Sequence, residues 1–208
     1  MSRLKKYVPK ILRPLIFDRL RSRNSMVPPK SMSFVGKGDF EKIGREFLTH
    51  FVNLAKLQPH ESVLDVGCGI GRMAIPLTEY LKPQGGYWGF DIVRKGIDWC
   101  TDRIVPKFPH FHFQHSNVYN KHYNPEGTVR AADYVFPFEA GFFDFIFLTS
   151  VFTHMVPADL ENYLKEIARV MKPGARCLIT MFLLNEKSRQ LILDGKSDLD
   201  FRHEIDGY

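Results

Sequence analysis

Three glycines at alternate positions follow a run of apolar residues in the first half of the chain. The stretch reads Val63-Leu64-Asp65-Val66-Gly67-Cys68-Gly69-Ile70-Gly71, with an acid two residues before the first glycine. Glycine is needed where the backbone turns with positive φ, and where it touches a ligand without an intervening Cβ. A strand, a glycine turn and a helix start also place free backbone N–H groups beside a bound ligand. The stretch therefore predicts a nucleoside-binding turn.

Two features indicate which kind of nucleoside the turn binds: the spacing of its glycines and the two acidic residues around it. Dinucleotide-binding turns have the spacing G-x-G-x-x-G, whereas this chain has G-x-G-x-G, with Arg72 where the last glycine would stand. Asp91 ends the next expected strand, where a carboxylate can accept hydrogen bonds from both hydroxyls of a ribose. Asp65 can accept from an ammonium group, directly or through water, and does not suit a phosphate. Two acids around the turn favour a cationic nucleoside.

The elements that must position these residues alternate along the chain. Asp39 is a suitable N-cap for a helix over about residues 40–57. Apolar runs at 145–148 and 177–184 are typical of parallel strands that are covered on both faces. The pattern predicts an α/β fold with strands at about 62–67, 86–91, 111–116, 143–149 and 176–184, and with further helices at about 71–82, 94–105 and 157–171.

Length and composition are those of one globular domain. The chain has 208 residues, of which 44% are hydrophobic and 25% charged. Its three cysteines, Cys68, Cys100 and Cys177, are far apart, which argues against a disulfide framework or a zinc site and favours the cytoplasm. His110, His112 and His115 surround one expected strand, but His115 lies on the opposite face, so no metal site is expected. No apolar run approaches the roughly 18 residues of a membrane span.

The basic character of the protein is concentrated at its N-terminus. Residues 1–30 hold nine Lys or Arg and one Asp, a net charge of +8, whereas the rest of the chain has a net charge of −2. Apolar residues in the first twenty positions follow helical spacing, interrupted by Pro9 and Pro14. This arm either packs on its own domain or binds an anionic membrane surface, which would make the protein peripheral to a membrane. We expect an arm and linker over residues 1–33 and one domain over 34–208.

Four segments in order resemble the motifs of class I S-adenosylmethionine-dependent methyltransferases. They are Asp65 to Gly71, Gly89-Phe-Asp91, Phe143 to Leu148 and Glu166 to Gly174, and the resemblance covers about residues 55–184. It implies a Rossmann-like three-layer αβα sandwich with a mainly parallel sheet. It also implies S-adenosylmethionine as cofactor, S-adenosylhomocysteine as product, and methyl transfer to O or N of a small-molecule acceptor.

The resemblance also assigns roles to individual residues. The glycine turn would hold the methionine end of the cofactor. The acid after the second strand would bind the ribose of the cofactor, and the segment after the third strand would contact the adenine. After the fourth strand come Thr149, Ser150, Thr153 and His154, where such enzymes line the pocket around the methyl group. His154 is the best candidate for a general base, because an unperturbed imidazole has a pKa of about 6.5. The cofactor-binding residues so implied are Asp65, Gly67, Cys68, Gly69, Gly71, Asp91, Ile92, Asn117, Val118 and Thr149.

Two other function classes remain open from the sequence. The basic arm suggests a nucleic-acid methyltransferase, but no Asn/Asp-Pro-Pro-Tyr/Phe signature follows the fourth strand and the body is not basic. The second alternative is a non-catalytic cofactor-binding or interaction module. Several aromatic residues could form an acceptor pocket or equally belong to the core, namely Tyr119, Tyr123, Tyr134, Phe136 and Phe152.

The short C-terminal segment predicts a departure from the family's sheet. Only 24 residues follow Leu184, too few for a helix and the usual C-terminal β-hairpin. We therefore expect about five strands and an open sheet edge. The last helix, the N-terminal arm or another chain would cover that edge, and the third option would make the protein a dimer.

Overall fold

Five parallel strands form a single sheet in the computed structural model, which describes residues 25–34, 36, 38–182 and 184–197. The strand order is β3-β2-β1-β4-β5, and every neighbouring pair is parallel. The predicted α/β class and the count of about five strands are confirmed. The strands are β1 (Ser62–Val66), β2 (Gly86–Asp91), β3 (Phe111–His115), β4 (Phe143–Leu148) and β5 (Met171–Ile179).

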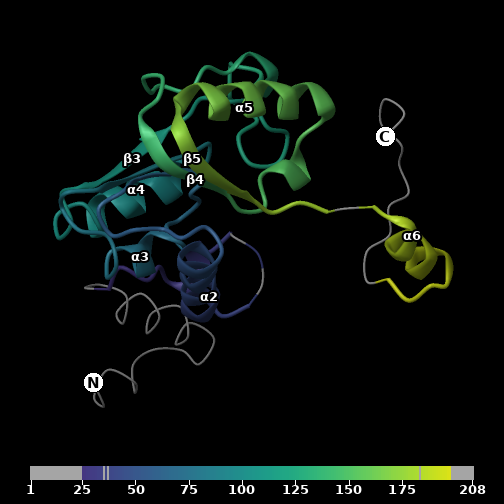
Figure 1. Cartoon of the computed structure of the whole chain (residues 1–208), viewed down its shortest axis with the longest axis horizontal. Helices are drawn as coiled ribbons and strands as arrows, with labels where there is room; N and C mark the ends of the chain where they lie inside the picture. The colour runs from purple at the N-terminus through teal and green to yellow at the C-terminus, as the bar shows by residue number, and fades with distance from the viewer. Residues whose placement is uncertain (1–24, 35, 37, 183, 198–208) are drawn as a thin grey trace, which may run out of the picture.

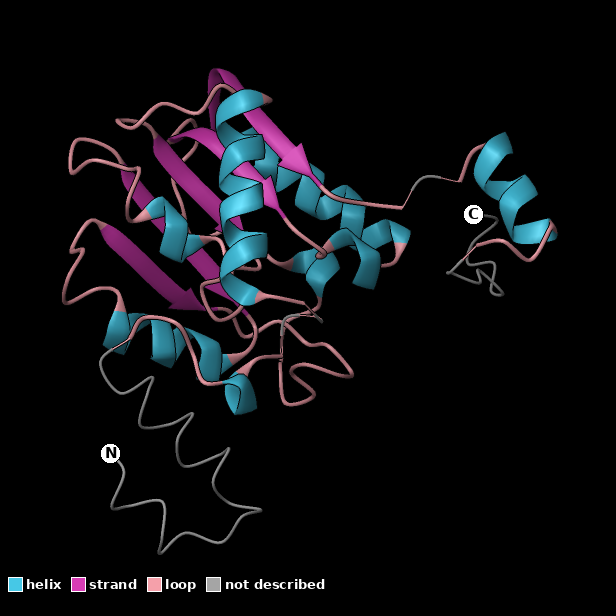
Figure 2. Cartoon of the chain, turned by 90° about the horizontal axis from the view of Figure 1, so that it is seen from below, coloured by secondary structure: helices cyan, strands magenta, loops and turns pink. Residues whose placement is uncertain are grey.

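Helices cover both faces of the sheet, as Figure 2 shows. One core cluster joins the sheet to α2 (Phe40–Asn53), α3 (Ala74–Leu77) and α4 (Arg94–Arg103). The other joins it to α5 (Pro157–Val170) and the short helix η3 (Ala131–Asp133). Strand β4 supplies both clusters, since Phe145 and Phe147 face one layer while Ile146 and Leu148 face the other. The expected three-layer sandwich is therefore present.

Several predicted bounds were wrong: the helix expected over 40–57 ends at Asn53, and two other elements differ for identifiable reasons. The helix expected over 71–82 is reduced to the four residues of α3, because Gly71 has φ +83° and the chain makes turns before Ala74. Strand β5 begins at Met171, five residues early, because a register shift against Phe143 and Phe145 accommodates the extra residues. It also ends at Ile179 and is only half-buried, so the apolar run 177–184 does not form a strand covered on both faces.

The two ends of the described chain differ in how they contact the body. Near the N-terminus, Pro28 and Pro29 are buried, and the Trp99 indole donates to the Met26 carbonyl at 2.9 Å. At the other end, α6 (Glu186–Leu193) has no buried residue and stands apart from the sheet (Figure 1). The prediction that the last helix covers the open sheet edge was therefore wrong for the edge at β5. Residues 1–24, which make up most of the expected arm, lie outside the described residues. No helix among the described residues is long and apolar enough to span a bilayer.

Helix α4 forms a rigid support directly behind the glycine turn. A Cβ on Gly96 would collide with the backbone carbonyl of Gly69. A Cβ on Gly71 would lie 2.9 Å from the Cys100 Sγ of the same helix. The absence of two side chains therefore allows the helix and the turn to make backbone contact, which fixes the turn's position.

Replacing Gly96 with alanine should separate these two elements. We expect Gly96→Ala to destabilise the protein by about 1–3 kcal/mol, the usual cost of overpacking, even though alanine favours helices. Chemical denaturation measures the change, with Thr101→Ala at an exposed position of α4 as the control. Equal stability of the two variants would contradict the close packing.

Candidate active site

Three backbone N–H groups of the glycine turn donate hydrogen bonds to the end of strand β2. Gly67 and Cys68 both donate to the Phe90 carbonyl, at 2.9 and 3.0 Å. The Gly69 N–H donates to the Asp91 carboxylate at 2.7 Å. Gly67 and Gly69 have φ of +81° and +59°, in the left-handed region that glycine adopts readily. The sequence thus forms this turn because glycine occupies each position that needs such a φ.

Asp91 is a buried carboxylate held by backbone groups on both of its oxygens. Its second oxygen accepts from the Val93 N–H at 2.7 Å, and only 9% of the residue is exposed. Burial raises the pKa of Asp91, and the hydrogen bonds from Val93 and Gly69 oppose that rise. Each carboxylate oxygen has two lone-pair directions, so further donors can bind. The group can therefore accept hydrogen bonds from a ligand while it holds the turn.

Asp65 is the most unusual group of the site because one of its oxygens has no partner. The residue is 1% exposed, and the Tyr87 hydroxyl donates to its Oδ2 at 2.7 Å. Its Oδ1 is buried without a hydrogen-bond partner. Burial raises the pKa of Asp65 to about 8, against the effect of the Tyr87 hydrogen bond, and the charge of Asp91 adds to the rise. The site therefore contains a carboxyl group that has no cationic partner and whose Oδ1 has no hydrogen-bonding partner.

A cavity of about 700 Å³ opens at the carboxyl ends of the strands, beside the glycine turn. It is large enough for a nucleoside cofactor together with a small second ligand, since pockets for small molecules have about 300–1,000 Å³. The structure brings most of the predicted residues together around it. Those that line it are Asp65, Gly67, Cys68, Gly69, Asp91, Ile92, Val118, Thr149 and His154.

Two of the predicted residues do not line the cavity. Gly71 packs against α4, as described above. The Asn117 side chain is exposed and donates to the Thr128 hydroxyl at 2.8 Å, whereas the buried Val118 faces the cavity. Neighbouring side chains of an extended segment point in opposite directions, so only one of the two can face the ligand. The geometry assigns that position to Val118.

The aromatic residues whose role the sequence left open divide into pocket residues and core residues. Tyr119 and Tyr123 line the cavity and are 50% and 41% exposed. Phe136 and Phe152 are buried in the cluster under α5, and Tyr134 packs against that cluster. Sequence reasoning left this choice open because aromatic residues suit both environments.

Other lining residues were not predicted from the sequence. They include residues of α2 and of α5. Ile43 and Phe47 of α2 fit an ordinary apolar helix stripe, which gave no sign that they face a cavity. Asp159 and Tyr163 are four residues apart on α5, and that helical spacing was the one signal that could have paired them.

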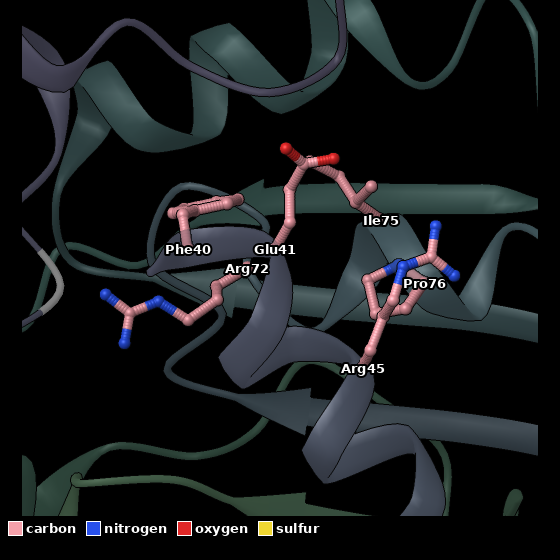
Figure 3. Close-up of a pocket in the computed structure, with 6 residues that line it drawn as sticks. All are labelled: Phe40, Glu41, Arg45, Arg72, Ile75 and Pro76. Carbon is pink, nitrogen blue, oxygen red and sulfur yellow. The ribbon is translucent and has the colours of Figure 1, made fainter. Parts of the chain in front are cut away.

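A second hollow between α2 and the segment after the glycine turn is too small for a ligand. It has a volume of about 10 Å³, about the minimum for one water molecule. Figure 3 shows Phe40, Glu41 and Arg45 of α2 beside Ile75 and Pro76. Arg45 is already engaged there by both oxygens of Glu79, at 2.9 and 3.0 Å. The cavity at the strand ends is therefore the candidate site.

Comparison with known proteins identifies the family. Residues 40–205 match the family described as "Methyltransferase domain". The chain belongs to this family, which confirms the resemblance to class I S-adenosylmethionine-dependent methyltransferases.

Individual relatives have low sequence identity to this chain. The chain is 26% identical over 160 residues to phosphoethanolamine N-methyltransferase 3 of Arabidopsis thaliana, and the match covers 74% of this chain. It spans 27% of the length of that relative.

Solved structures share the fold at lower identity. The PH0226 protein from Pyrococcus horikoshii OT3 has a TM-score of 0.55 and 19% identity, over 80% of this chain and 67% of its own. Phosphoethanolamine N-methyltransferase 2 of Haemonchus contortus, solved in complex with S-adenosyl-L-methionine, has a TM-score of 0.51 and 20% identity. That likeness covers 77% of this chain and 34% of the other. These likenesses confirm the Rossmann-like α/β fold.

The buried carboxyl group of Asp65 should make stability depend on pH. The pKa of about 8 in the folded protein lies above the ordinary value of 3.8, so the folded state binds the proton more tightly and loses stability as the pH rises between these values. We expect Asp65→Asn to stabilise the ligand-free protein. The advantage should grow by at most about 1.4 kcal/mol per pH unit from pH 4 to 8 and level off above.

Thermal denaturation of both proteins across this pH range provides the measurement. Asp98→Asn, at an exposed position of α4, serves as the matched control. A stability difference for Asp65→Asn that stays constant from pH 4 to 8 would show that Asp65 is not the titrating group.

Proposed function

We propose that this protein is an S-adenosylmethionine-dependent methyltransferase that transfers a methyl group to O or N of a small-molecule acceptor. The observation that carries the proposal is the pair of buried carboxyl groups, Asp65 and Asp91, on either side of the glycine turn. They lie at the carboxyl ends of adjacent strands and line one cavity. Membership of the methyltransferase domain family supports the same function.

The residues present fit the cofactor. The partnerless Oδ1 of Asp65 suits the ammonium group of the methionine end, which would supply the missing donor. Asp91 would accept from the ribose hydroxyls, while Ile92 and Val118 offer apolar contact for the adenine. The backbone at Gly67, Cys68 and Gly69 would lie against the methionine end. The two carboxylates also suit the positive charge of a sulfonium compound.

The remainder of the cavity would hold the acceptor. Bound S-adenosylmethionine supplies an electrophilic methyl group, so the protein's task is to align the acceptor atom behind it, and such alignment can contribute several kcal/mol. Thr149 and His154 lie on the segment after β4 and line the cavity. The exposed His154 imidazole would accept a proton from an acceptor that must lose one.

The curated relatives support nitrogen as the acceptor atom. Phosphoethanolamine N-methyltransferases 1 and 3 of Arabidopsis thaliana by name methylate an amine. The similarity is 26% and covers a minor part of their length, so it supports the class of acceptor and not its identity.

Cofactor binding should depend strongly on Asp91. We expect S-adenosylmethionine to bind the wild-type protein and Asp91→Ala to weaken binding at least tenfold, because two hydroxyls lose their acceptor and Gly69 loses its anchor. Isothermal titration calorimetry measures both affinities. Asp133→Ala is the control, since this exposed acid pairs with Arg130. Equal affinities for the wild type and Asp91→Ala would contradict the assignment.

The N-terminal arm carries a separate proposal. We propose that the protein acts in the cytoplasm and that its basic segment, residues 1–30, binds anionic membrane surfaces. Most of the charge lies in residues 1–24, which hold eight Lys or Arg and one Asp. Because Met26 contacts Trp99, a deletion that ends at residue 24 leaves this contact intact. Liposome flotation should show the full chain on anionic vesicles at low salt and the shortened chain in solution. Identical flotation of both chains would remove the idea.

A further inference from the structure

Besides the glycine turn and its two acids, the lining of the cavity includes three tyrosines and a third carboxyl group. Tyr119 and Tyr123 come from the loop after β3, and Tyr163 comes from α5. Tyr163 is 3% exposed and contacts Phe136 edge to face, with ring centroids 5.1 Å apart. The Tyr123 ring contacts the His154 ring at 5.5 Å, which joins the loop after β3 to the segment after β4. The Tyr123 and Tyr163 rings are therefore each held by a neighbouring ring, and all three tyrosines line the same cavity.

Asp159 places a negative charge in the same space. It lies one helical turn before Tyr163, so both side chains lie on one face of α5, and both line the cavity. None of the ion pairs between described residues includes Asp159. The nearby Arg130 is instead bound by Asp133 at 2.6 Å. Asp159 is thus available to a ligand.

The charges of the described lining residues also favour a cation. Three carboxyl groups, Asp65, Asp91 and Asp159, line the cavity with the single guanidinium of Arg72. Arg72 contacts the Gly36 carbonyl at 3.3 Å and the Phe40 ring at 5.5 Å. Cations are attracted to the faces of aromatic rings, most strongly where water is excluded. A ring cluster beside a carboxylate is the arrangement that recognises an ammonium group.

We propose that the methyl acceptor is an amine, and that Tyr119, Tyr123, Tyr163 and Asp159 form the subsite that binds its ammonium form and the methylated product. This inference rests on the proposed function. In the transfer, the amine nitrogen forms a bond to the methyl carbon, and the carbon–sulfur bond breaks with its electron pair left on sulfur. The proton that the ammonium group must first lose passes to the His154 imidazole and then to solvent.

A pair of probes with the same shape and different charge tests this subsite directly. Choline carries a trimethylammonium group, and 3,3-dimethylbutan-1-ol is its neutral counterpart. Neither needs to react, so the readout is binding alone, followed by calorimetry or ligand-observed NMR. We expect choline to bind at least tenfold more tightly than the alcohol. Asp159→Asn should reduce choline affinity about fivefold or more and leave the alcohol unchanged.

The matched control is Glu161→Gln, on the same helix. The Glu161 side chain is 73% exposed and lies 3.9 Å from Lys165, away from the cavity. Choline affinity should change less than twofold in this variant. A purely structural role of Asp159 in the first turn of α5 would alter thermal stability and both probes alike. Equal binding of choline and the alcohol, or equal choline affinity in the two variants, would overturn the proposal.

The titrations are made with and without saturating S-adenosylhomocysteine. This design distinguishes a failure of the proposed methyltransferase function from a failure of the proposed amine subsite. Absence of S-adenosylhomocysteine binding would contradict the proposed function alone, because choline can still be titrated into the ligand-free protein. Binding of S-adenosylhomocysteine without preference for choline would contradict the amine subsite alone.

Discussion

The hydrogen bond from the Gly69 N–H to the Asp91 carboxylate is the contact on which the site depends. It joins the glycine turn after β1 to the end of β2 at 2.7 Å, in a buried environment. Burying a carboxylate is costly unless hydrogen bonds compensate, and here the backbone N–H groups of Gly69 and Val93 provide them. The same interaction that makes the buried acid tolerable therefore fixes the turn against the sheet.

Asp65 is a buried carboxyl group whose burial is only partly compensated by hydrogen bonds. Tyr87 satisfies one of its oxygens, but Oδ1 has no partner and the pKa of the group rises to about 8. Strained or unsatisfied groups occur often at functional sites, where a ligand completes them. A cationic ligand is the partner that both acids suit.

Much of the fold could be predicted from the sequence because its strongest signals are local. Strand β2 has the predicted bounds, and the glycine turn lies where its spacing placed it. The extent of β5 could not be predicted, because its register shift depends on pairing with a strand about 30 residues away. The choice between Asn117 and Val118 depends on which side of an extended segment faces the cavity. Asp159 and Tyr163 could not be assigned because only the tertiary fold brings α5 to the loop after β3.

The central claim is that a cationic cofactor completes the buried acid Asp65. At pH 6.5, below its pKa of about 8, this group carries a proton in the ligand-free protein, and an adjacent cation would favour its ionised form. Calorimetric titration with S-adenosylmethionine in buffers of different ionisation enthalpy measures the protons released. We predict a release close to one proton per molecule in the wild type and none in Asp65→Asn. Binding by the wild type without proton release would contradict the account.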